Sequence, residues 1–406
     1  MKWKELLEIR SGKNQKTVID PNGQYPIYGS GGIIGYATEY LCPPKTTIVG
    51  RKGTINSPIF VNESFWNVDT AFGLIPSSKL LPKYLYYFCC HFNFTALDKS
   101  TTIPSLAKRD LENIEMNVPP LDEQSRIVAR IEELFSELDK AVDTLKTTKE
   151  QLAVYRQAVL KSAFEGKYTI DWRKSNDCSV DNDYLKIKKN NQIFKDTSGD
   201  ENELILKIPN TWMKVRFGEI FDVEVCATPS RQHKEYWNGK IAWVSSGEVR
   251  FESINRTHEM ITQHGLNNSS TNLQPIGTVL LAMIGEGKTR GQAAILNIPA
   301  AHNQNTAAIL VSRTPCQPKY VYYFLQLNYE NTRRVGSGNN QKALNKERVR
   351  AIRFPFAPVE EQVAIVKEID ERLSVCDSIE KTVDAALAQA DAMRQSILKQ
   401  AFEGKI

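Results

Sequence analysis

The sequence lacks the features that mark several protein classes. It has no run of 18 apolar residues and no basic segment followed by an apolar one, so it predicts neither a membrane span nor an export signal. Its seven cysteines are odd in number and have no CxxC spacing, which argues against a disulfide framework and a zinc cluster. His233, His258 and His264 have no partners at metal-ligand spacing, so no metal site is assigned. These absences predict a cytoplasmic protein.

Catalytic motifs are also missing. Residues 282–289, AMIGEGKT, fit a relaxed phosphate-binding loop, but Gly291 and Pro299 leave room for a turn between strands and not for the helix that such a loop needs. Residues 117–120, NVPP, lack the contiguous Asn-Pro-Pro-aromatic motif with which amino-methyltransferases hold a flipped base. No methyl-donor loop and no Ser/His/Asp set is present. We therefore expect a chain without a catalytic centre or cofactor of its own.

What the chain does have is ordinary globular composition and a modest positive charge. Its 406 residues suffice for two or three domains, and 41% of them are hydrophobic and 24% charged, as in other globular proteins. The net charge of +5 and the pI near 8.6 are compatible with a nucleic-acid partner. Composition alone does not identify that partner.

The most informative feature is a repeat. Residues 121–167 match residues 359–405 without a gap at an offset of 238, and 19 of the 47 aligned positions are identical. Each copy follows a proline, at Pro120 or Pro358, and each ends at a glycine, at Gly166 or Gly404. Proline is tolerated at the start of a helix and glycine favours its end, so each copy predicts one long helix. The protein is a tandem duplication.

Apolar residues recur along both predicted helices with a period of seven. A stripe of this kind packs best on another long helix, and the other copy is the obvious partner. Pairing is antiparallel if a pseudo-twofold axis relates the copies; a parallel pair, or two helices that each pack on their own domain, are the alternatives. Thr148, Arg372 and Cys376 interrupt the stripe. The residues predicted to pair are Ile127, Ile131, Leu134, Leu138, Leu145, Leu152, Ile365, Ile369, Ile379, Val383, Met393 and Ile397.

A globular segment precedes each predicted helix. The first, 1–118, has candidate strands at 46–50, 59–61 and 71–75 and a helix at 82–92; its glycine-rich stretch 25–36 predicts a surface loop. The second segment is 208–356. It repeats parts of the first, because 82–88 (PKYLYYF) matches 318–324 (PKYVYYF) at an offset of 236. The first helix segment is 119–167 and the second is 357–406. A polar linker at 168–207, with a short helix near 184–189, joins the first helix segment to the second globular segment.

These residues resemble the specificity (S) subunit of type I restriction-modification enzymes. The resemblance rests on the two helix starts, PPLDEQ (119–124) and APVEEQ (357–362), and on the two AFEGK endings. TIDWR at 169–173 and IPNTW at 208–212 add to it, with Thr211 where the family has glycine. It implies an α+β protein with two homologous mixed α/β target recognition domains, each followed by a long helix, the helices forming an antiparallel coiled coil with pseudo-twofold symmetry.

The resemblance also implies a function and partners. Each recognition domain would read one half of a bipartite target in double-stranded DNA, and the helices would set the spacing between the halves. Two methylation (M) subunits and restriction/motor (R) subunits would assemble on the chain and bind S-adenosylmethionine, ATP and Mg²⁺, in the cytoplasm of a bacterium or archaeon. The alternatives are a coiled-coil adaptor without a DNA role and a self-contained methyltransferase or nuclease.

Candidate DNA contacts lie in polar, cationic turns, because reading bases needs hydrogen-bonding side chains and binding phosphates needs Lys and Arg. The alternative is that these turns have only the composition of ordinary surface loops. In the first domain the candidates are Arg51, Lys52, Asn56, Ser100, Thr101 and Thr102. In the second they are Lys288, Arg290, Arg333, Arg334, Asn339, Asn340, Gln341 and Lys342.

Overall fold

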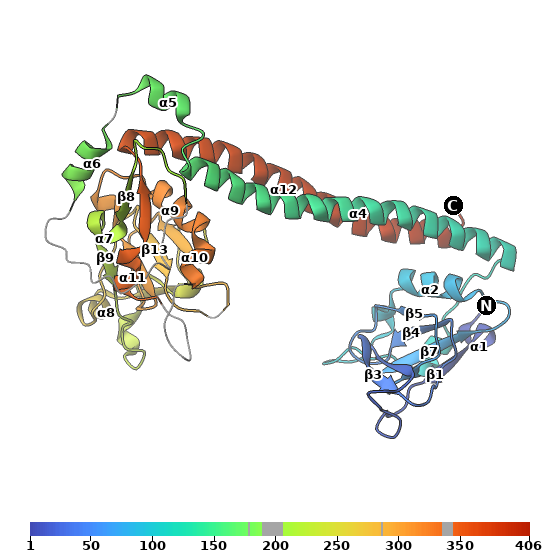
Figure 1. The fold of residues 1–406 in the computed structure, drawn as a ribbon. Coiled ribbons are helices and arrows are strands. Elements are labelled where there is room, and N and C mark those ends of the chain that lie inside the picture. The colour runs from blue at the N-terminus through green and yellow to red at the C-terminus, as the bar shows by residue number, and fades with distance from the viewer. Residues whose placement is uncertain (178, 189–205, 286, 335–343) are drawn as a thin grey trace. The chain divides into compact units, whose positions relative to one another are not determined.

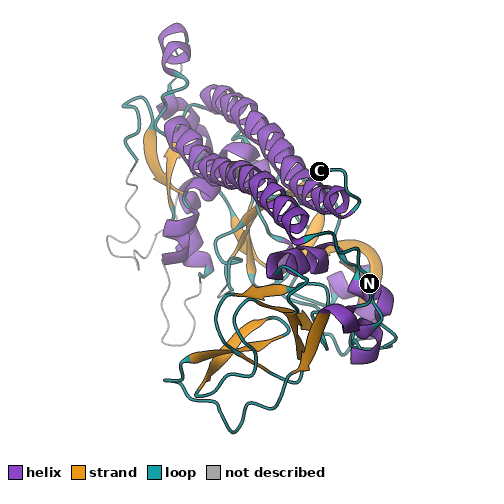
Figure 2. Ribbon diagram, turned by 90° about the vertical axis from the view of Figure 1, so that its right-hand side faces the viewer, coloured by secondary structure: helices purple, strands orange, loops and turns teal. Residues whose placement is uncertain are grey.

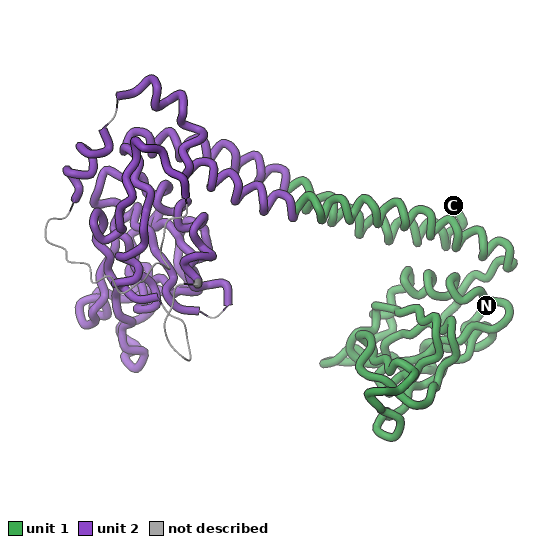
Figure 3. Tube along the Cα trace, viewed as in Figure 1, with its two compact units in different colours: residues 1–149, 381–406 green, residues 150–380 purple. Residues whose placement is uncertain are grey.

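The computed structural model describes residues 1–177, 179–188, 206–285, 287–334 and 344–406. It divides into two compact units: unit 1 comprises 1–149 and 381–406, and unit 2 comprises 150–380 (Figure 3). The two long helices, α4 (Leu121–Phe164) and α12 (Val359–Phe402), each contain 44 residues and contribute to both units. Within the described ranges, no helix has the length and apolar character needed to span a membrane.

Unit 1 contains a small mixed domain and segments of both long helices (Figure 1). Besides these segments, its elements are α1 (Trp3–Leu6), β1 (Leu7–Ser11), β2 (Tyr25–Gly29), β3 (Gly32–Ala37), β4 (Thr46–Gly50), β5 (Ile59–Val61), β6 (Trp66–Asn67), β7 (Ala71–Pro76), α2 (Pro82–His91) and α3 (Lys108–Glu112). The strands at 46–50 and 59–61 and the helix from Pro82 were expected from the sequence and are confirmed, and β7 extends one residue beyond the expected strand.

Unit 2 contains a larger domain of the same kind. Its elements, besides the helix segments, are α5 (Ile170–Ser175), α6 (Val180–Ile187), β8 (Met213–Arg216), α7 (Phe217–Ile220), β9 (Val223–Val225), β10 (Trp237–Val244), β11 (Ser253–Ile254), β12 (Glu259–Ile261), α8 (Gln263–Asn267), β13 (Val279–Ala282), β14 (Ala293–Leu296), β15 (Ala300–His302), β16 (Thr306–Ile309), α9 (Pro318–Leu327), α10 (Tyr329–Arg334), α11 (Lys346–Ala351) and β17 (Arg353–Phe356).

The two domains repeat one arrangement of sheets, and their strands gather in the globular parts (Figure 2). Unit 1 has sheets of order β1-β7-β4-β5 and β3-β2-β6; unit 2 has β11-β14-β13-β16-β9 and β12-β10-β15, besides the pair β17-β8. Ala71 of β7 pairs with Gly50 of β4, and its counterpart Ala307 of β16 pairs with Leu281 of β13. The second sheet combines one antiparallel and one parallel pair in both units. The expected α+β fold with two homologous domains is confirmed.

The glycine-rich stretch 25–36 is not the surface loop that its composition indicated. It forms a hairpin of β2 and β3, in which Ser30 and Gly31 make the turn and Gly32 begins β3 with a φ of +127°. The register shifts between Ile27 and Tyr28, because their partners are Gly35 and Ile33 and the intervening Ile34 is an extra residue, as in a β-bulge. Ile27 is fully buried. The prediction was wrong because the glycines shape the turn and the bulge, while the residues between them pair as strands.

The predicted linker 168–207 is partly folded. Helix α5 was not expected, and α6 overlaps the short helix expected near 184–189 but begins earlier, at Val180. Thr169 is buried and Val180 belongs to the core of unit 2. The polar composition was misleading because short helices can bury a few residues while most of their surface stays in water. Residues 189–205 lie outside the described residues.

Within each unit, the segments of α4 and α12 run antiparallel. In unit 1, Asp139 accepts from Arg394, and Asp384 Oδ1 lies 2.7 Å from Lys149 Nζ, so residue numbers rise on one helix as they fall on the other. In unit 2, Arg156 Nη2 donates to Asp377 Oδ1 at 2.6 Å. Asp377 and Arg394 are the counterparts of Asp139 and Arg156 at the offset of 238, so the same pair occurs once in each unit. This arrangement is the one expected of two copies related by a twofold axis.

Burial defines the seam between the helices more closely than the heptad pattern did. Ile379 and Met393, both predicted to pair, are 40% and 47% exposed, whereas Cys376, taken as an interruption, is 1% exposed. Cys376 continues a column with a period of seven through Ile369, Val383 and Ala390, each of which is buried. The other predicted seam residues are buried at Ile127, Ile131, Leu138, Leu152 and Ile365 and half-buried at Leu134, Leu145 and Ile397.

Each domain core is closed by both long helices. In unit 1, Ile131 of α4 and Leu398 of α12 belong to one hydrophobic core with the first domain. In unit 2, Leu160 of α4 and Ile369 of α12 belong to one core with the second domain. The phenylalanine shared by the two AFEGK endings also packs into a domain core. Phe402 packs on Tyr84 and Phe88 of the first domain, at ring distances of 5.2 and 5.4 Å, and its counterpart Phe164 packs on Tyr320 and Phe324 of the second, at 4.9 and 5.6 Å.

The glutamine shared by both helix starts anchors each helix to its domain. Gln124 accepts from the Leu81 amide at 2.8 Å and donates to the carbonyls of Lys79 and Pro119. Gln362 accepts from the Gln317 amide at 3.1 Å and donates to the Ala357 carbonyl. Both side chains are fully buried. The glutamine is retained in both copies because it satisfies main-chain groups that water does not reach.

Replacing this glutamine with leucine should destabilise the protein. Gln124→Leu leaves one amide and two carbonyls without their partner, and we expect a loss of about 2 kcal/mol in the free energy of unfolding, as with Gln362→Leu. Urea unfolding of each variant and of the wild type measures this loss in the free energy of unfolding. Gln157→Leu is the matched control, because Gln157 is also shared by both helices but is exposed; an equal loss there would contradict the explanation.

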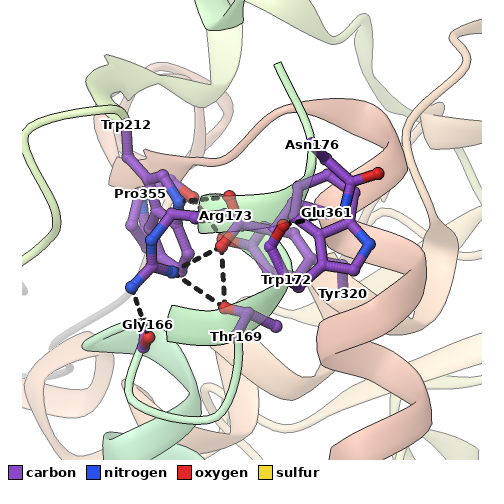
Figure 4. A network of polar contacts seen from close by, with 9 residues as sticks. All are labelled: Gly166, Thr169, Trp172, Arg173, Asn176, Trp212, Tyr320, Pro355 and Glu361. Atoms are coloured by element: carbon purple, nitrogen blue, oxygen red, sulfur yellow. Dashed lines mark hydrogen bonds and ion pairs between the residues drawn. The ribbon is translucent and has the colours of Figure 1, made fainter. Parts of the chain in front are cut away.

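The glutamate shared by both helix starts has different surroundings in the two copies. Glu361 is fully buried, and it accepts hydrogen bonds from Trp212 Nε1 at 2.8 Å, Arg173 Nη1 at 2.6 Å and Thr169 Oγ1 at 2.7 Å (Figure 4). Arg173 also donates to the carbonyl of Gly166, which ends α4 with a φ of +69°. Glu123, the counterpart of Glu361, is exposed. This network therefore joins the end of α4, the TIDWR segment and the start of α12 in unit 2.

Candidate nucleic-acid interface

In unit 1 the candidate residues Arg51 and Lys52 occupy a tight turn that follows β4. Their amides both donate to the Thr70 carbonyl, at 2.8 and 3.2 Å, so the turn folds back over the start of β7. A Cβ at Gly50 would lie 2.0 Å from the Thr54 carbonyl oxygen, so only glycine allows this close approach. The Arg51 guanidinium lies 5.8 Å from the centre of the Phe72 ring, while Lys52 is exposed. The fold thus places two cations at the end of the main sheet.

The second candidate stretch, 100–102, lies beside this turn. The Gly53 amide donates to the Pro104 carbonyl at 2.9 Å, and the Leu106 amide donates to the Arg51 carbonyl at 2.8 Å. Two stretches that are about fifty residues apart in sequence therefore form one surface, as their assignment to one site required. Ser100, Thr101 and Thr102 are all exposed on it.

Asp98 holds the loop that carries these residues. Its Oδ1 accepts from the Ser100 hydroxyl at 2.6 Å and from the amides of Ser100 and Ser105, both at 3.0 Å. These hydrogen bonds, with the Ser100 hydroxyl contributing most, hold the pKa of the Asp98 carboxyl below its usual range. The Ser100 hydroxyl is therefore engaged within the loop, whereas Asp98 does not hold the hydroxyls of Thr101 and Thr102, the other two candidates.

Asn56, a candidate for contacting DNA, is exposed, and its side-chain amide also has a structural role within the domain. Its Oδ1 accepts from the Phe94 amide at 2.8 Å, and its Nδ2 donates to Asn93 Oδ1 at 3.3 Å. The amide thereby joins the segment after β4 to the turn after α2. Sequence could not distinguish the two roles, because an asparagine in a turn suits either.

Next to the turn is a cavity of about 380 Å³ with a cationic lining. Its polar lining includes Arg51, Lys52, Lys99, Lys108 and Asp110. Asp110 is paired with Lys99 at 2.9 Å, so the carboxylate offsets only one of the four cations. The surplus of positive charge suits the phosphate groups of a DNA backbone.

In unit 2, three candidate residues come together at the equivalent end of the main sheet. Arg290, in the connection between β13 and β14, donates from Nη2 to the Arg333 carbonyl at 2.8 Å. The Tyr329 hydroxyl donates to the Lys288 carbonyl and accepts from Arg333 Nη1, whose guanidinium lies 5.3 Å from the Tyr329 ring centre. The connection between β13 and β14 is a turn between antiparallel strands. The sequence predicted such a turn here in place of a phosphate-binding loop. The Lys288 side chain is exposed.

The two units share the geometry of this surface. In unit 1 the Leu106 amide donates to the carbonyl of Arg51, and in unit 2 its counterpart Leu344 donates to the carbonyl of Met283 at 3.0 Å. In both units, therefore, the segment that precedes the last short helix of the domain joins the turn that follows the central strand. Arg334 ends α10, and the candidates Asn339, Asn340, Gln341 and Lys342 lie outside the described residues.

The sequence did not indicate the part played by the β2–β3 hairpin. A Cβ at Gly50 would lie 3.1 Å from Ser30 Cβ, and one at Gly53 would lie 3.7 Å from Ser30 Oγ. The hairpin tip therefore borders the Arg51–Lys52 turn. Its glycines between aromatic residues were the available signal, and they were taken to indicate a surface loop.

Comparison with known proteins agrees with this architecture. The family model for the type I restriction modification DNA specificity domain matches residues 1–153 and 209–389. The specificity subunit of the type I restriction enzyme EcoDI from Escherichia coli is 22% identical, over 99% of this chain and 87% of that protein. The EcoBI specificity subunit, also from Escherichia coli, is 24% identical, over 99% of this chain and 80% of that protein.

Solved structures show the same fold. A chain from a study of complex assembly and conformational transition of the type I R-M system superposes with a TM-score of 0.72 at 15% identity, over 100% of this chain and 97% of that one. The HsdS subunit from Thermoanaerobacter tengcongensis superposes with a TM-score of 0.52 at 15% identity, over 100% of this chain and 96% of that one. The resemblance seen in the sequence is confirmed. The family model covers most of the chain in two stretches, and this protein therefore belongs to the type I restriction modification DNA specificity domain family.

Proposed function

We propose that this chain, a DNA specificity protein by its family, reads a bipartite target in double-stranded DNA with one cationic surface in each unit. The observation that carries the proposal is the repeated geometry of these surfaces. Each is built from the turn after the central strand and the segment before the last short helix of the domain. The main-chain geometry of the two surfaces is the same, but their exposed residues differ. These are Lys52, Thr101 and Thr102 in unit 1 and Lys288 in unit 2. Two equivalent frames with different side chains suit two different half-sites.

The paired helices suit the role of a spacer between half-sites. The helices α4 and α12 each contribute to both units and pair antiparallel within each. A change in their length therefore changes the length of the connection between the two reading surfaces. The family supplies specificity and not catalysis. We therefore assign methylation to two M subunits and cleavage to R subunits, which would carry S-adenosylmethionine, ATP and Mg²⁺, in a cytoplasmic complex. Within the described residues, no group of His, Cys, Asp and Glu is arranged to hold a metal.

Replacing Lys52 with alanine should weaken DNA binding without changing which sequence is preferred. Lys52 is exposed beside the cationic cavity, so the lost contact is with phosphate. We expect the slope of log K against log salt to fall by about one, equally for target and non-target duplexes. Fluorescence anisotropy over a salt series, with the chain bound to its methylation subunits, measures both.

Lys146→Ala is the matched control for Lys52→Ala, because Lys146 is exposed on α4, away from the turn. It should leave the salt dependence unchanged. A coiled-coil adaptor without a DNA role would show no preference for any duplex, and neither substitution would alter its binding. That result would refute the proposed function.

A further inference from the structure

Three exposed isoleucines lie in the two segments that border the Arg51–Lys52 turn of unit 1, the β2–β3 hairpin and the loop held by Asp98. Ile33 and Ile34 are the second and third residues of β3 and are 53% and 56% exposed; Ile103 is 61% exposed. We call these three residues the apolar rim. Single exposed isoleucines are common on protein surfaces. Three of them near one cationic turn, on the surface proposed to bind DNA, suit a ligand with both negative and apolar groups.

Hydrogen bonds and close contacts place the rim at the turn. The Gly53 amide donates to the Pro104 carbonyl, which sets Ile103 beside the turn. On the other side, Ile34 Cγ2 lies 3.7 Å from where a Cβ at Gly29 would stand, and Thr70 Oγ1 lies 3.9 Å from the same point. The Thr70 carbonyl in turn accepts from the amides that follow β4. Ile34 and Ile103 therefore border the same turn from two separate segments.

The major groove of DNA offers one apolar group to such side chains. Among the four bases only thymine presents a methyl group there, at C5, and apolar side chains recognise thymine by contact with it. The cations beside the rim would meanwhile bind the phosphates and hold the groove against the surface. We propose that the apolar rim reads thymine: Ile103 and Ile34 contact the C5 methyl of thymine in the half-site bound by unit 1. This inference rests on the proposed function.

Charge favours DNA over a protein partner at this surface. Arg51, Lys52 and Lys108 line the neighbouring cavity. The cavity lining has one carboxylate, that of Asp110, and it is paired with Lys99 at 2.9 Å. The lining beside the rim therefore carries a surplus of positive charge. An apolar patch ringed by cations suits a polyanion that carries methyl groups.

Replacing thymine with uracil tests the proposal, because deoxyuridine differs from thymidine only in lacking the methyl group. The target is first identified by single-molecule methylome sequencing of cells that carry the chain and its partner subunits. Each thymine of the target is then replaced singly by deoxyuridine, and binding to the complex of the chain with its methylation subunits is measured by anisotropy. We expect a loss of about fourfold in affinity at one or more positions of one half-site, since one buried methyl group is removed.

The same substitutions are then measured with Ile103→Ala and Ile34→Ala. In at least one variant, replacing thymine with uracil should no longer weaken binding, because the contact has already been removed. Ile19→Ala is the matched control: Ile19 is 53% exposed and pairs with Ala37, at the end of the hairpin away from its turn, and this variant should keep the full fourfold loss. Thermal unfolding of all three variants should match that of the wild type.

Four outcomes would overturn the inference while leaving the proposed function intact, because the target would still be preferred over a scrambled duplex. They are half-sites without thymine, no penalty for uracil at any position, a penalty that both isoleucine variants retain, and a penalty that Ile19→Ala abolishes. Weaker assembly with methylation subunits in Ile103→Ala, without any dependence on uracil, would identify the rim as a protein contact. Absence of any preference for the target would refute the proposed function itself.

Discussion

Glu361→Ala should destabilise unit 2 by about 3–5 kcal/mol, because it removes one partner of a buried ion pair. Glu361 is fully buried, and the side chain of Arg173, its partner, is 17% exposed. The substitution leaves the Arg173 guanidinium, Trp212 Nε1 and Thr169 Oγ1 without the carboxylate oxygens that accept from them. Since the chain has two compact units, hydrogen exchange during urea unfolding should show the loss in α5 and at the start of α12.

The duplication provides a control for this experiment. Glu123 occupies the same place in the first copy but is exposed, so Glu123→Ala should change the free energy of unfolding by less than about 0.5 kcal/mol. A double variant, Glu361→Met with Arg173→Met, should cost less than the sum of the two single substitutions, because it leaves no unpaired buried charge. Equal losses at Glu361 and Glu123 would contradict this account of the network.

Lengthening both long helices by four residues should widen the gap between the recognised half-sites by about two base pairs. Four helical residues add about 6 Å, and each base pair of DNA spans about 3.4 Å. We would insert them between Thr147 and Thr148 of α4 and between Ala385 and Ala386 of α12, close to the Lys149–Asp384 ion pair. A four-residue insertion unwinds a coiled coil locally without interrupting its apolar stripe. Methylome sequencing should show the same two half-sites with the longer gap.

The ion pairs explain why the insertion must be made in both helices. Asp139–Arg394 in unit 1 and Arg156–Asp377 in unit 2 lie on either side of the insertion, and equal lengthening keeps both. Insertion into α4 alone shifts one pair by about 6 Å relative to the other, and we expect methylation to fall sharply. The same four residues between Asp196 and Thr197, outside both helices, should leave the gap unchanged. An unchanged gap after the paired insertion would end the interpretation of the helices as a spacer.

Local signals made parts of the fold predictable. The helix ends follow from Pro120, Pro358, Gly166 and Gly404, and several strands from short apolar runs between turn residues. The hairpin at 25–36 was missed because its pairing partners, not its composition, decide that it is a sheet. Cys376 was misplaced for a similar reason: a small apolar thiol fits a helix seam, which only the position of the facing helix reveals.

The candidate residues of unit 1 came from two stretches that the fold brings together, and their contact with DNA stays a prediction. The stretches at 51–56 and 100–102 do meet, because each lies next to elements that the sheet brings together. Hydrogen bonds within the folded domain decided which of their polar groups are already engaged. The Asn56 side chain accepts from the Phe94 amide, and the Ser100 hydroxyl donates to Asp98. Only the folded chain shows these hydrogen bonds.

By itself, the sequence determined that the protein is a duplication with two long helices and two related domains, because periodicity and a constant offset are properties of the covalent chain. Tertiary structure alone decided that each helix ends on the other copy's domain, as Phe164 and Phe402 do. It also decided that Glu361 is buried while Glu123 is exposed. Identical residues acquire different roles when their surroundings differ, and those surroundings come from segments far away in the chain.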